Sequence, residues 1–190
     1  VAAIGQKNIK RLMAYSSIGH IGYILAGVAT GTNSGYSSSL IYMSIYSVMN
    51  LGAFSCIYLM KKNGEYVEEI SDLSGISKER PVLAISFLII FFSLAGIPPL
   101  GGFFAKFYVF MSVIESKMYV LATIGLLTTV ISAFYYLKII KTIYFDDNKF
   151  KLDDSGSLSV NGTLFMSCFI LLTFFLYPSI LNSLIYNLFG

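Results

Sequence analysis

Charged residues are scarce in this sequence. They make up 12% of its 190 residues, against about 25% in soluble domains. Hydrophobic residues make up 56%, and the mean hydropathy is +0.73. The formal net charge of +3 is too small to indicate a nucleic-acid-binding protein. The composition excludes a soluble globular domain and predicts an all-α, polytopic transmembrane protein.

Residues that could hold a metal or a haem are also few. The sequence has one histidine and two cysteines, and it contains no zinc, phosphate-loop or dinucleotide motif and no nucleophile triad. Cys56 and Cys168 each lie inside an apolar run, where a thiol behaves as a small hydrophobic side chain. We therefore expect two buried free thiols, and no cofactor bound by this chain.

Long uncharged runs divide the chain into membrane spans of the roughly 20 residues that a bilayer requires. The first run, Leu12–Met60, is interrupted by the turn-forming cluster Gly31–Gly35. Charged loops are expected at 61–80 and 142–158. We expect the stub of an earlier helix at 1–5 and spans at about 13–30, 38–60, 81–116 with a break at 96–102, 118–141 and 162–187.

The run Pro81–Ile114 is too long for one straight crossing. Its 34 residues would form a helix of about 51 Å, whereas the hydrocarbon core is about 30 Å thick. It could form two short spans or one broken crossing. A single crossing places the basic clusters at 7–11, 61–80 and 138–151 on one side of the membrane, as the positive-inside rule favours. We therefore expect one discontinuous helix and five crossings.

Lys106 is the only charged residue in this run, and it follows the expected break closely. A charge deep in a membrane is costly and usually serves ion or proton transfer. The low dielectric and the positive end of a second half-helix both disfavour a permanent ammonium, as a proton-carrying lysine requires. The alternative is a lysine that snorkels to the interface. The helix break is expected at Gly96, Pro98, Pro99, Gly101 and Gly102.

Two further residues are candidates for proton transfer. His20 lies inside a span, and Ser16 and Tyr23 share its helical face. This polar stripe could line a hydrated path or make hydrogen bonds between helices, and a histidine can carry a proton near neutral pH. Lys138 ends the fourth span beside two tyrosines, where an interfacial anchor is the favoured interpretation and a proton role the lesser one.

Three segments carry a family resemblance. Residues 6–23 (QKNIKRLMAYSSIGHIGY), 93–108 (SLAGIPPLGGFFAKFY) and 133–138 (AFYYLK) resemble the antiporter-like subunits of respiratory complex I. His20 together with Lys106 is similar to the subunit 2 branch of this family, which is subunit N in bacteria. The resemblance covers nearly the whole chain and implies a proton-translocating subunit of an NADH:ubiquinone reductase.

The resemblance also implies that the chain corresponds to the second of two inverted repeats. At the positions of Lys106 and His20, the family has a lysine that passes protons and a histidine on the hydrated axis. A glutamate and lysines of the first repeat have no counterpart here, so a companion chain is expected to supply the missing N-terminal half. NADH, FMN, iron–sulfur clusters and quinone are expected in partner subunits, and no metal or other cofactor in this chain.

Partners and location follow from the same resemblance. The expected partners are other membrane-arm subunits of complex I, including other antiporter-like subunits, and lipids, with no nucleic acid. Abundant Ile, Phe, Tyr, Lys and Asn suggest an AT-rich genome and the mitochondrial inner membrane, with the bacterial plasma membrane as the alternative. Two other functions stay open: a subunit of a multisubunit cation/proton antiporter, and a non-pumping structural remnant with a dry, carboxylate-paired Lys106.

Overall fold

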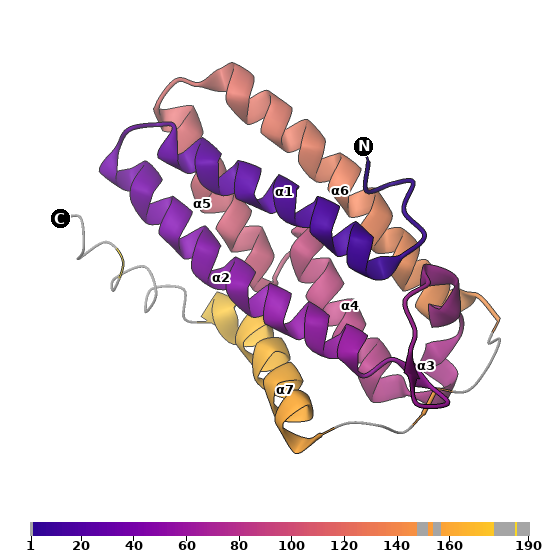
Figure 1. Ribbon diagram of the computed structural model, residues 1–190. Helices are drawn as coiled ribbons and strands as arrows, with labels where there is room; N and C mark the ends of the chain where they lie inside the picture. The colour runs from indigo at the N-terminus through magenta and orange to yellow at the C-terminus, as the bar shows by residue number, and fades with distance from the viewer. Residues whose placement is uncertain (1, 148–151, 154–156, 177–184, 186–190) are drawn as a thin grey trace.

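The chain folds into a bundle of long helices (Figure 1). The computed structural model describes residues 2–147, 152–153, 157–176 and 185. Within these residues, three helices are long and apolar enough to cross a membrane, at Asn33–Tyr58, Tyr119–Phe145 and Leu158–Leu176. The all-α class expected from the sequence is confirmed.

The first two helices, α1 (Ile9–Val28) and α2 (Asn33–Tyr58), form a pair joined by a short connection. α2 begins five residues before the expected 38, because the Thr32 side chain accepts a hydrogen bond from the Gly35 backbone amide and caps the helix. Part of the expected turn cluster is therefore helical. The Cβ of any other residue at Gly35 would overlap the Gly27 carbonyl, so these glycines let the two helices approach closely.

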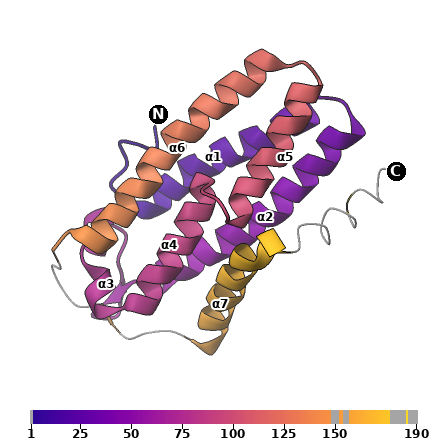
Figure 2. The same cartoon turned by 180° about the vertical axis from the view of Figure 1, so that it is seen from behind.

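The expected discontinuous helix is present as α4 (Pro81–Ala95) and α5 (Gly101–Glu115). The two halves follow one another through the bundle, joined by residues 96–100 (Figure 2). Pro81 occupies the first turn of α4, where its missing N–H costs nothing. The break is shorter than the 96–102 inferred from the sequence.

The last helices are α6 (Tyr119–Phe145) and α7 (Leu158–Thr173), with a 3-10 turn, η2 (Phe174–Leu176), after α7. α6 contacts α4 and α1, while α7 packs on α2 and α4. α6 extends beyond the expected 141 into the expected loop. The rest of that loop and the expected end of the last span at 187 fall partly outside the described residues.

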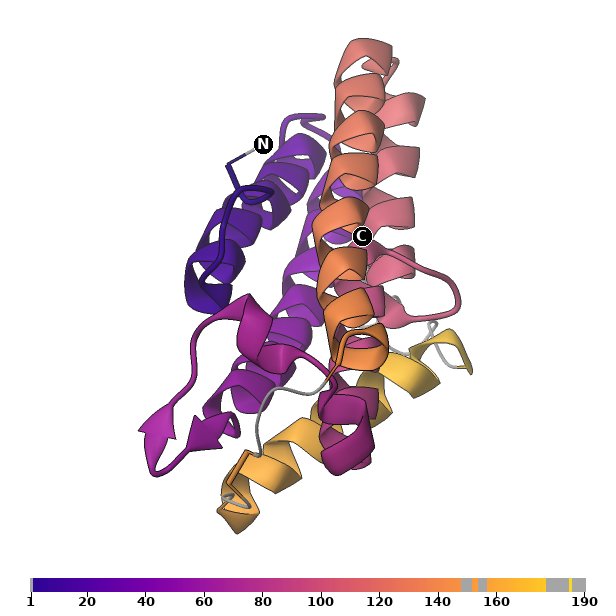
Figure 3. The ribbon, with the colours of Figure 1, turned by 90° about the vertical axis from the view of Figure 1, so that its right-hand side faces the viewer.

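The connections at one end of the bundle are tied together (Figure 3). They contain the hairpin β1 (Lys61–Lys62) and β2 (Glu65–Tyr66), the 3-10 turn η1 (Ile70–Leu73) and the short helix α3 (Ile76–Glu79). Backbone bonds join Ile9 to Glu68 and Gly75 to Thr142, and the Asp153 carboxylate accepts from the Asn63 and Gly64 amides. We call this the basic end, since it gathers the lysines of three separate segments.

The side chains divide the bundle into a packed interior and an apolar outer surface. Large side chains such as Tyr42, Phe87 and Phe91 are fully buried. Val82, Val120 and Val130 remain 70–77% exposed on outer faces. Such a surface suits lipid, where helices satisfy their own backbone groups. The fold is that of a multi-pass membrane protein.

Candidate functional site

The end of α4 leaves two carbonyl groups without helical partners. Gly96 takes a φ of +86°, and the Ile97 amide bonds back to the Phe92 carbonyl, which closes the helix in the manner of a Schellman motif. Four residues after Leu94 and Ala95 come Pro98 and Pro99, which have no N–H to donate. The carbonyls of Leu94 and Ala95 therefore need other donors.

Lys106 supplies those donors from the second turn of α5. Its Nζ donates to the carbonyl oxygens of Leu94 and Ala95, each at 3.0 Å, and the side chain is only 5% exposed. The sequence indicated only the positive end of α5, which disfavours an ammonium. The structure adds the negative end of α4, which favours one, so the two helix ends act on Lys106 in opposite directions.

The start of α5 is capped in return by α4. The Ser93 hydroxyl accepts a hydrogen bond of 2.9 Å from the Gly102 amide, one of the amides that has no partner within α5. Gly101 and Gly102 were expected in the break, but they form the first turn of α5. A Cβ at Gly102 would overlap the Ser93 carbonyl, so this glycine serves the close approach of the half-helices.

The surroundings of the Lys106 amine are neutral in the part of the chain that the structure describes. The amine lies 5.3 Å from the centre of the Tyr23 ring, within range of a cation–π interaction. Its hydrogen bonds run to carbonyl oxygens, and neither described salt bridge involves it. The carboxylate pairing expected of a structural remnant is absent among the described residues.

His20 is held between two phenols from other helices. Its Nδ1 lies 2.8 Å from the Tyr42 hydroxyl, and its Nε2 lies 3.0 Å from the Tyr136 hydroxyl. The Tyr136 hydroxyl also hydrogen-bonds Ser16. A neutral imidazole has one donor and one acceptor nitrogen, so one tyrosine donates and the other accepts. Ser16, His20 and Tyr42 thus belong to one hydrogen-bonded chain across α1, α6 and α2.

The tyrosines around His20 were missed by the sequence reasoning. The His20 ring stacks on Tyr46 at 4.7 Å, and the Tyr23 hydroxyl accepts from Thr129 on α6. Tyr136 lies within the AFYYLK motif, which pointed to the segment but not to this residue. Tyr42 carries no comparable signal, since nothing in its sequence neighbourhood indicates that it meets a histidine 22 positions away.

Lys138 is not brought to this site. It is exposed on α6 and lines a cavity at the basic end with Gln6, Lys7 and Thr142. Lys138 comes two residues after Tyr136, so the two side chains leave opposite sides of α6, and Lys138 faces residues of the basic end instead of His20. A proton role for Lys138 at the buried site therefore has no geometric support.

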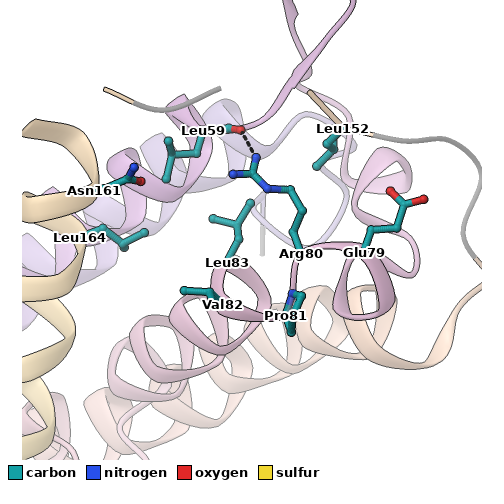
Figure 4. A pocket seen from close by; sticks show the side chains of 9 residues that line it. All are labelled: Leu59, Glu79, Arg80, Pro81, Val82, Leu83, Leu152, Asn161 and Leu164. Atoms are coloured by element: carbon teal, nitrogen blue, oxygen red, sulfur yellow. Dashed lines mark hydrogen bonds between the residues drawn. The ribbon is translucent and has the colours of Figure 1, made fainter. Parts of the chain in front are cut away.

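A larger cavity of about 520 Å³ lies at the start of α4 (Figure 4). Arg80 reaches across it and donates from Nη1 to the carbonyls of Leu59 and Asp153, at 3.1 and 3.0 Å. These bonds join the end of α2 to the segment after α6. The cavity thus lies among the hydrogen bonds that hold the connections of the basic end together. Among the described residues, no cluster of side chains could hold a metal ion.

Comparison with known proteins places this geometry in a family. The model of the transmembrane family "NADH:quinone oxidoreductase/Mrp antiporter" matches residues 1–132. The NADH-quinone oxidoreductase subunit N of Pelagibacter ubique is 60% identical over 179 residues, which are 94% of this chain and 38% of that protein. The chain thus spans well under half the length of this relative.

Two solved structures share the fold. A chain of respiratory complex I from Thermus thermophilus is 27% identical, with a TM-score of 0.80 over 96% of this chain and 41% of that one. A chain of the Mrp complex from Dietzia sp. has a TM-score of 0.85 over 97% and 42%, and at 20% identity it shows the fold alone. The resemblance inferred from the three sequence segments is confirmed, and the chain belongs to the transmembrane family of NADH:quinone oxidoreductase and Mrp antiporter subunits.

Proposed function

We propose that this chain is part of a proton-translocating subunit of the membrane arm of NADH:quinone oxidoreductase, of the subunit N type. The sequence identity of 60% to a subunit N, against 20% to the Mrp-complex chain, favours this over a cation/proton antiporter. We place it in the bacterial plasma membrane, because the relatives named above are bacterial. The mitochondrial membrane suggested by the composition finds no support among them.

The observation that carries this proposal is the bonding of Lys106. An ammonium has three N–H donors and a neutral amine has two, with one lone pair. The carbonyls of Leu94 and Ala95 take two donors, and both protonation states can provide them. Gain or loss of a proton therefore changes only the third position of the nitrogen, and no ion pair has to break. Such a group suits the repeated uptake and release of a proton.

His20 is the second proposed proton carrier. An imidazole that accepts a proton at one nitrogen can release one from the other, and both ring nitrogens already contact hydroxyl groups. Lys106 and His20 both lie beside Tyr23, which contacts the amine and the imidazole ring edge to face. We propose that the two groups act in one pathway, completed by residues outside this sequence.

The chemistry that drives the pathway is proposed to lie elsewhere in the complex. NADH, FMN, iron–sulfur clusters and quinone would bind to partner subunits. Changes of charge in the neighbouring membrane-arm subunits would alter the protonation of Lys106 and His20 in this chain. The proposed neighbours are other antiporter-like subunits, a polypeptide with the remainder of the subunit, and lipids.

The test is Lys106→Met in the assembled complex, with electron transfer and proton uptake measured together in vesicles. Methionine keeps much of the volume and removes the exchangeable proton. We expect fewer protons pumped per NADH oxidised. Lys141→Met is the matched control, since it removes an exposed lysine of the same bundle and should leave the ratio unchanged. An unaltered ratio in Lys106→Met contradicts the proposal. Purification with small antiporter subunits, and no NADH oxidation, would favour the antiporter alternative.

A further inference from the structure

The cavity at the start of α4 is polar on one side and apolar on the other (Figure 4). Its volume of about 520 Å³ lies within the range of roughly 300–1,000 Å³ that is usual for small-molecule sites. The described residues of its polar side are Glu79, Arg80 and Asn161. The apolar side is formed by proline and aliphatic side chains, namely Leu59, Pro81, Val82, Leu83, Leu152 and Leu164.

The cavity lies at the depth where the loops give way to membrane-spanning helices. Arg80 immediately precedes the run Pro81–Ile114, in which Lys106 is the only charged residue. On the other wall, α7 contributes Asn161 from its first turns, and the residues from Leu158 to Leu176 carry no charge. The polar lining residues therefore lie at the level of the lipid headgroups, with hydrocarbon beyond them.

The same two helices carry apolar side chains on their outer faces beside the cavity. Val82 of α4 is 77% exposed, and Phe165 of α7 is 69% exposed. Nearer the middle of the bundle α4 and α7 converge, since Ile90 and Ser167 both lie close to Gly52 of α2. Toward the basic end they separate, and the cavity lies between them (Figure 2). This shape suits a polar headgroup whose acyl chain lies along apolar helix faces.

The wall formed by the start of α4 is electropositive. The Arg80 guanidinium lies on this wall, where its bonds to the carbonyls of Leu59 and Asp153 fix its position. The backbone amides of Val82 and Leu83, which also line the cavity, have no acceptor among the described residues, and no side chain caps this helix. A fixed positive charge beside donors at the start of a helix is complementary to a phosphate group.

We propose that this cavity binds the headgroup of a phosphatidylethanolamine lipid. The phosphate lies beside Arg80 and the first turn of α4, the ammonium lies toward the Glu79 carboxylate, and an acyl chain follows the outer faces of α4 and α7. Glu79 and Arg80 are neighbours of opposite charge, which favours a zwitterionic headgroup over one that carries only negative charge. The proposal requires only that the chain lies in a membrane, so it does not depend on the proposed proton translocation.

The test measures lipid contact in the assembled complex, held in lipid nanodiscs. The nanodiscs contain a trace of either phosphatidylethanolamine or phosphatidylglycerol with a photoreactive diazirine next to the glycerol. After irradiation, mass spectrometry identifies the labelled residues of this chain. We expect phosphatidylethanolamine to label residues 79–83 and 161–164 more strongly than phosphatidylglycerol does. Val120 and Ile124, which are exposed on α6, report contact with bulk lipid and should be labelled equally by both.

Two variants separate the contributions of the two charges. Glu79→Gln removes the partner of the ammonium and should abolish the preference for phosphatidylethanolamine. Arg80→Gln should lower labelling by both lipids about tenfold, because hydrogen bonds to charged groups are among the stronger ones. Lys78→Gln is the control, since it removes an exposed lysine of α3 that does not line the cavity. It should leave both the strength of labelling and the preference unchanged.

Equal labelling of the cavity residues by the two lipids refutes the proposal, as does a preference that persists in Glu79→Gln. A photoreactive benzoylphenylalanine in place of Val82 tests the other occupant. Its cross-linking to another polypeptide, and not to lipid, would mean that a partner subunit covers the cavity, and would also refute the proposal. Glu79→Gln decides the matter if Arg80→Gln does not assemble, because the Glu79 side chain is exposed. Labelling requires no turnover, so normal pumping by Lys106→Met would not affect this result.

Discussion

The basic side chains at the basic end and those in the interior of the bundle have different kinds of partners. At the basic end Lys10 lies 2.6 Å from Glu68 and Lys141 lies 3.0 Å from Asp146. In the interior, Lys106 is bound by backbone carbonyls, and His20 by tyrosine hydroxyls. A carboxylate stabilises the charged form of its partner, whereas a neutral acceptor holds both forms. The described ion pairs thus lie at the basic end, whereas the buried basic side chains are held by neutral acceptors.

The close contact at the helix break gives the largest expected effect. Gly102→Ala would place a Cβ against the Ser93 carbonyl and push α4 and α5 apart, which removes the geometry that holds Lys106. We expect a loss of stability at the upper end of about 1–3 kcal/mol, seen as a lower melting temperature and poor assembly of the complex. Gly19→Ala, with open space around its Cβ, is the control. Equal melting temperatures for the two variants would show that the close contact at Gly102 does not determine the stability of the complex.

The next effect concerns the chain of hydroxyls at His20. Tyr136→Phe keeps the ring but leaves Ser16 and the His20 Nε2 without this partner. Each unpaired buried group costs about 1–3 kcal/mol, so both stability and pumping should decrease. The measurements are thermal melting and the number of protons pumped per NADH. Tyr119→Phe alters an exposed tyrosine at the start of α6 and should change neither. Full pumping by Tyr136→Phe would exclude this hydroxyl from the path.

A single cap should have a smaller effect. Ser93→Ala removes the acceptor of the Gly102 amide and costs about 1–3 kcal/mol if no water replaces it. The loss should appear in thermal melting of the complex. Ser47→Ala removes an exposed hydroxyl that bonds its own helix, so it reports the cost of losing a hydroxyl alone. Indistinguishable melting curves would mean that the half-helices do not depend on this cap.

The smallest effect is expected at the basic end. Hydrogen bonds from Lys10 and Asn8 lower the pKa of the exposed Glu68 carboxyl. Because the folded pKa is depressed, this pair stabilises the loop above the ordinary carboxyl pKa, and the contribution is lost as the pH falls through the lowered value. Hydrogen exchange of the Ile9 amide, which bonds the Glu68 carbonyl, should lose protection in that acidic range.

Glu68→Gln should remove that pH dependence, while Glu65→Gln, at the exposed hairpin, should retain it. Protection of Ile9 that follows the same pH profile in wild type and in Glu68→Gln would assign the loop's stability to its backbone bonds. In that case the ion pair of Lys10 and Glu68 would not contribute to the difference between the basic end and the interior.

The sequence was most informative where a residue type is unusual for a membrane helix. A lysine in a long apolar run and a double proline predicted the broken helix, because hydrocarbon tolerates neither without compensation. The compensation itself could not be predicted. Which carbonyls Lys106 binds depends on residues 96–100 placing the start of α5 beside the last turn of α4. Gly102 was expected within the break and not as a point of contact.

The environment of His20 shows the same limit. The stripe formed by Ser16, His20 and Tyr23 was predicted from helical spacing, and all three are buried. Their partners come from α2 and α6, and Tyr136 is 116 residues away from His20. Spacing within one helix carries no information on such distant contacts.

The two hydrogen bonds from Lys106 to carbonyl oxygens also limit how often its amine can turn away from the helix break. An amine that turns away from Leu94 and Ala95 leaves two acceptors unpaired, at about 1–3 kcal/mol each. With tenfold for every 1.4 kcal/mol, the turned-away state is rarer by a factor of about thirty to about twenty thousand. The Lys106 amine therefore rests on these two carbonyls nearly all of the time. A water or another donor that reaches those carbonyls would satisfy them in its place and make the turned-away position of Lys106 less costly.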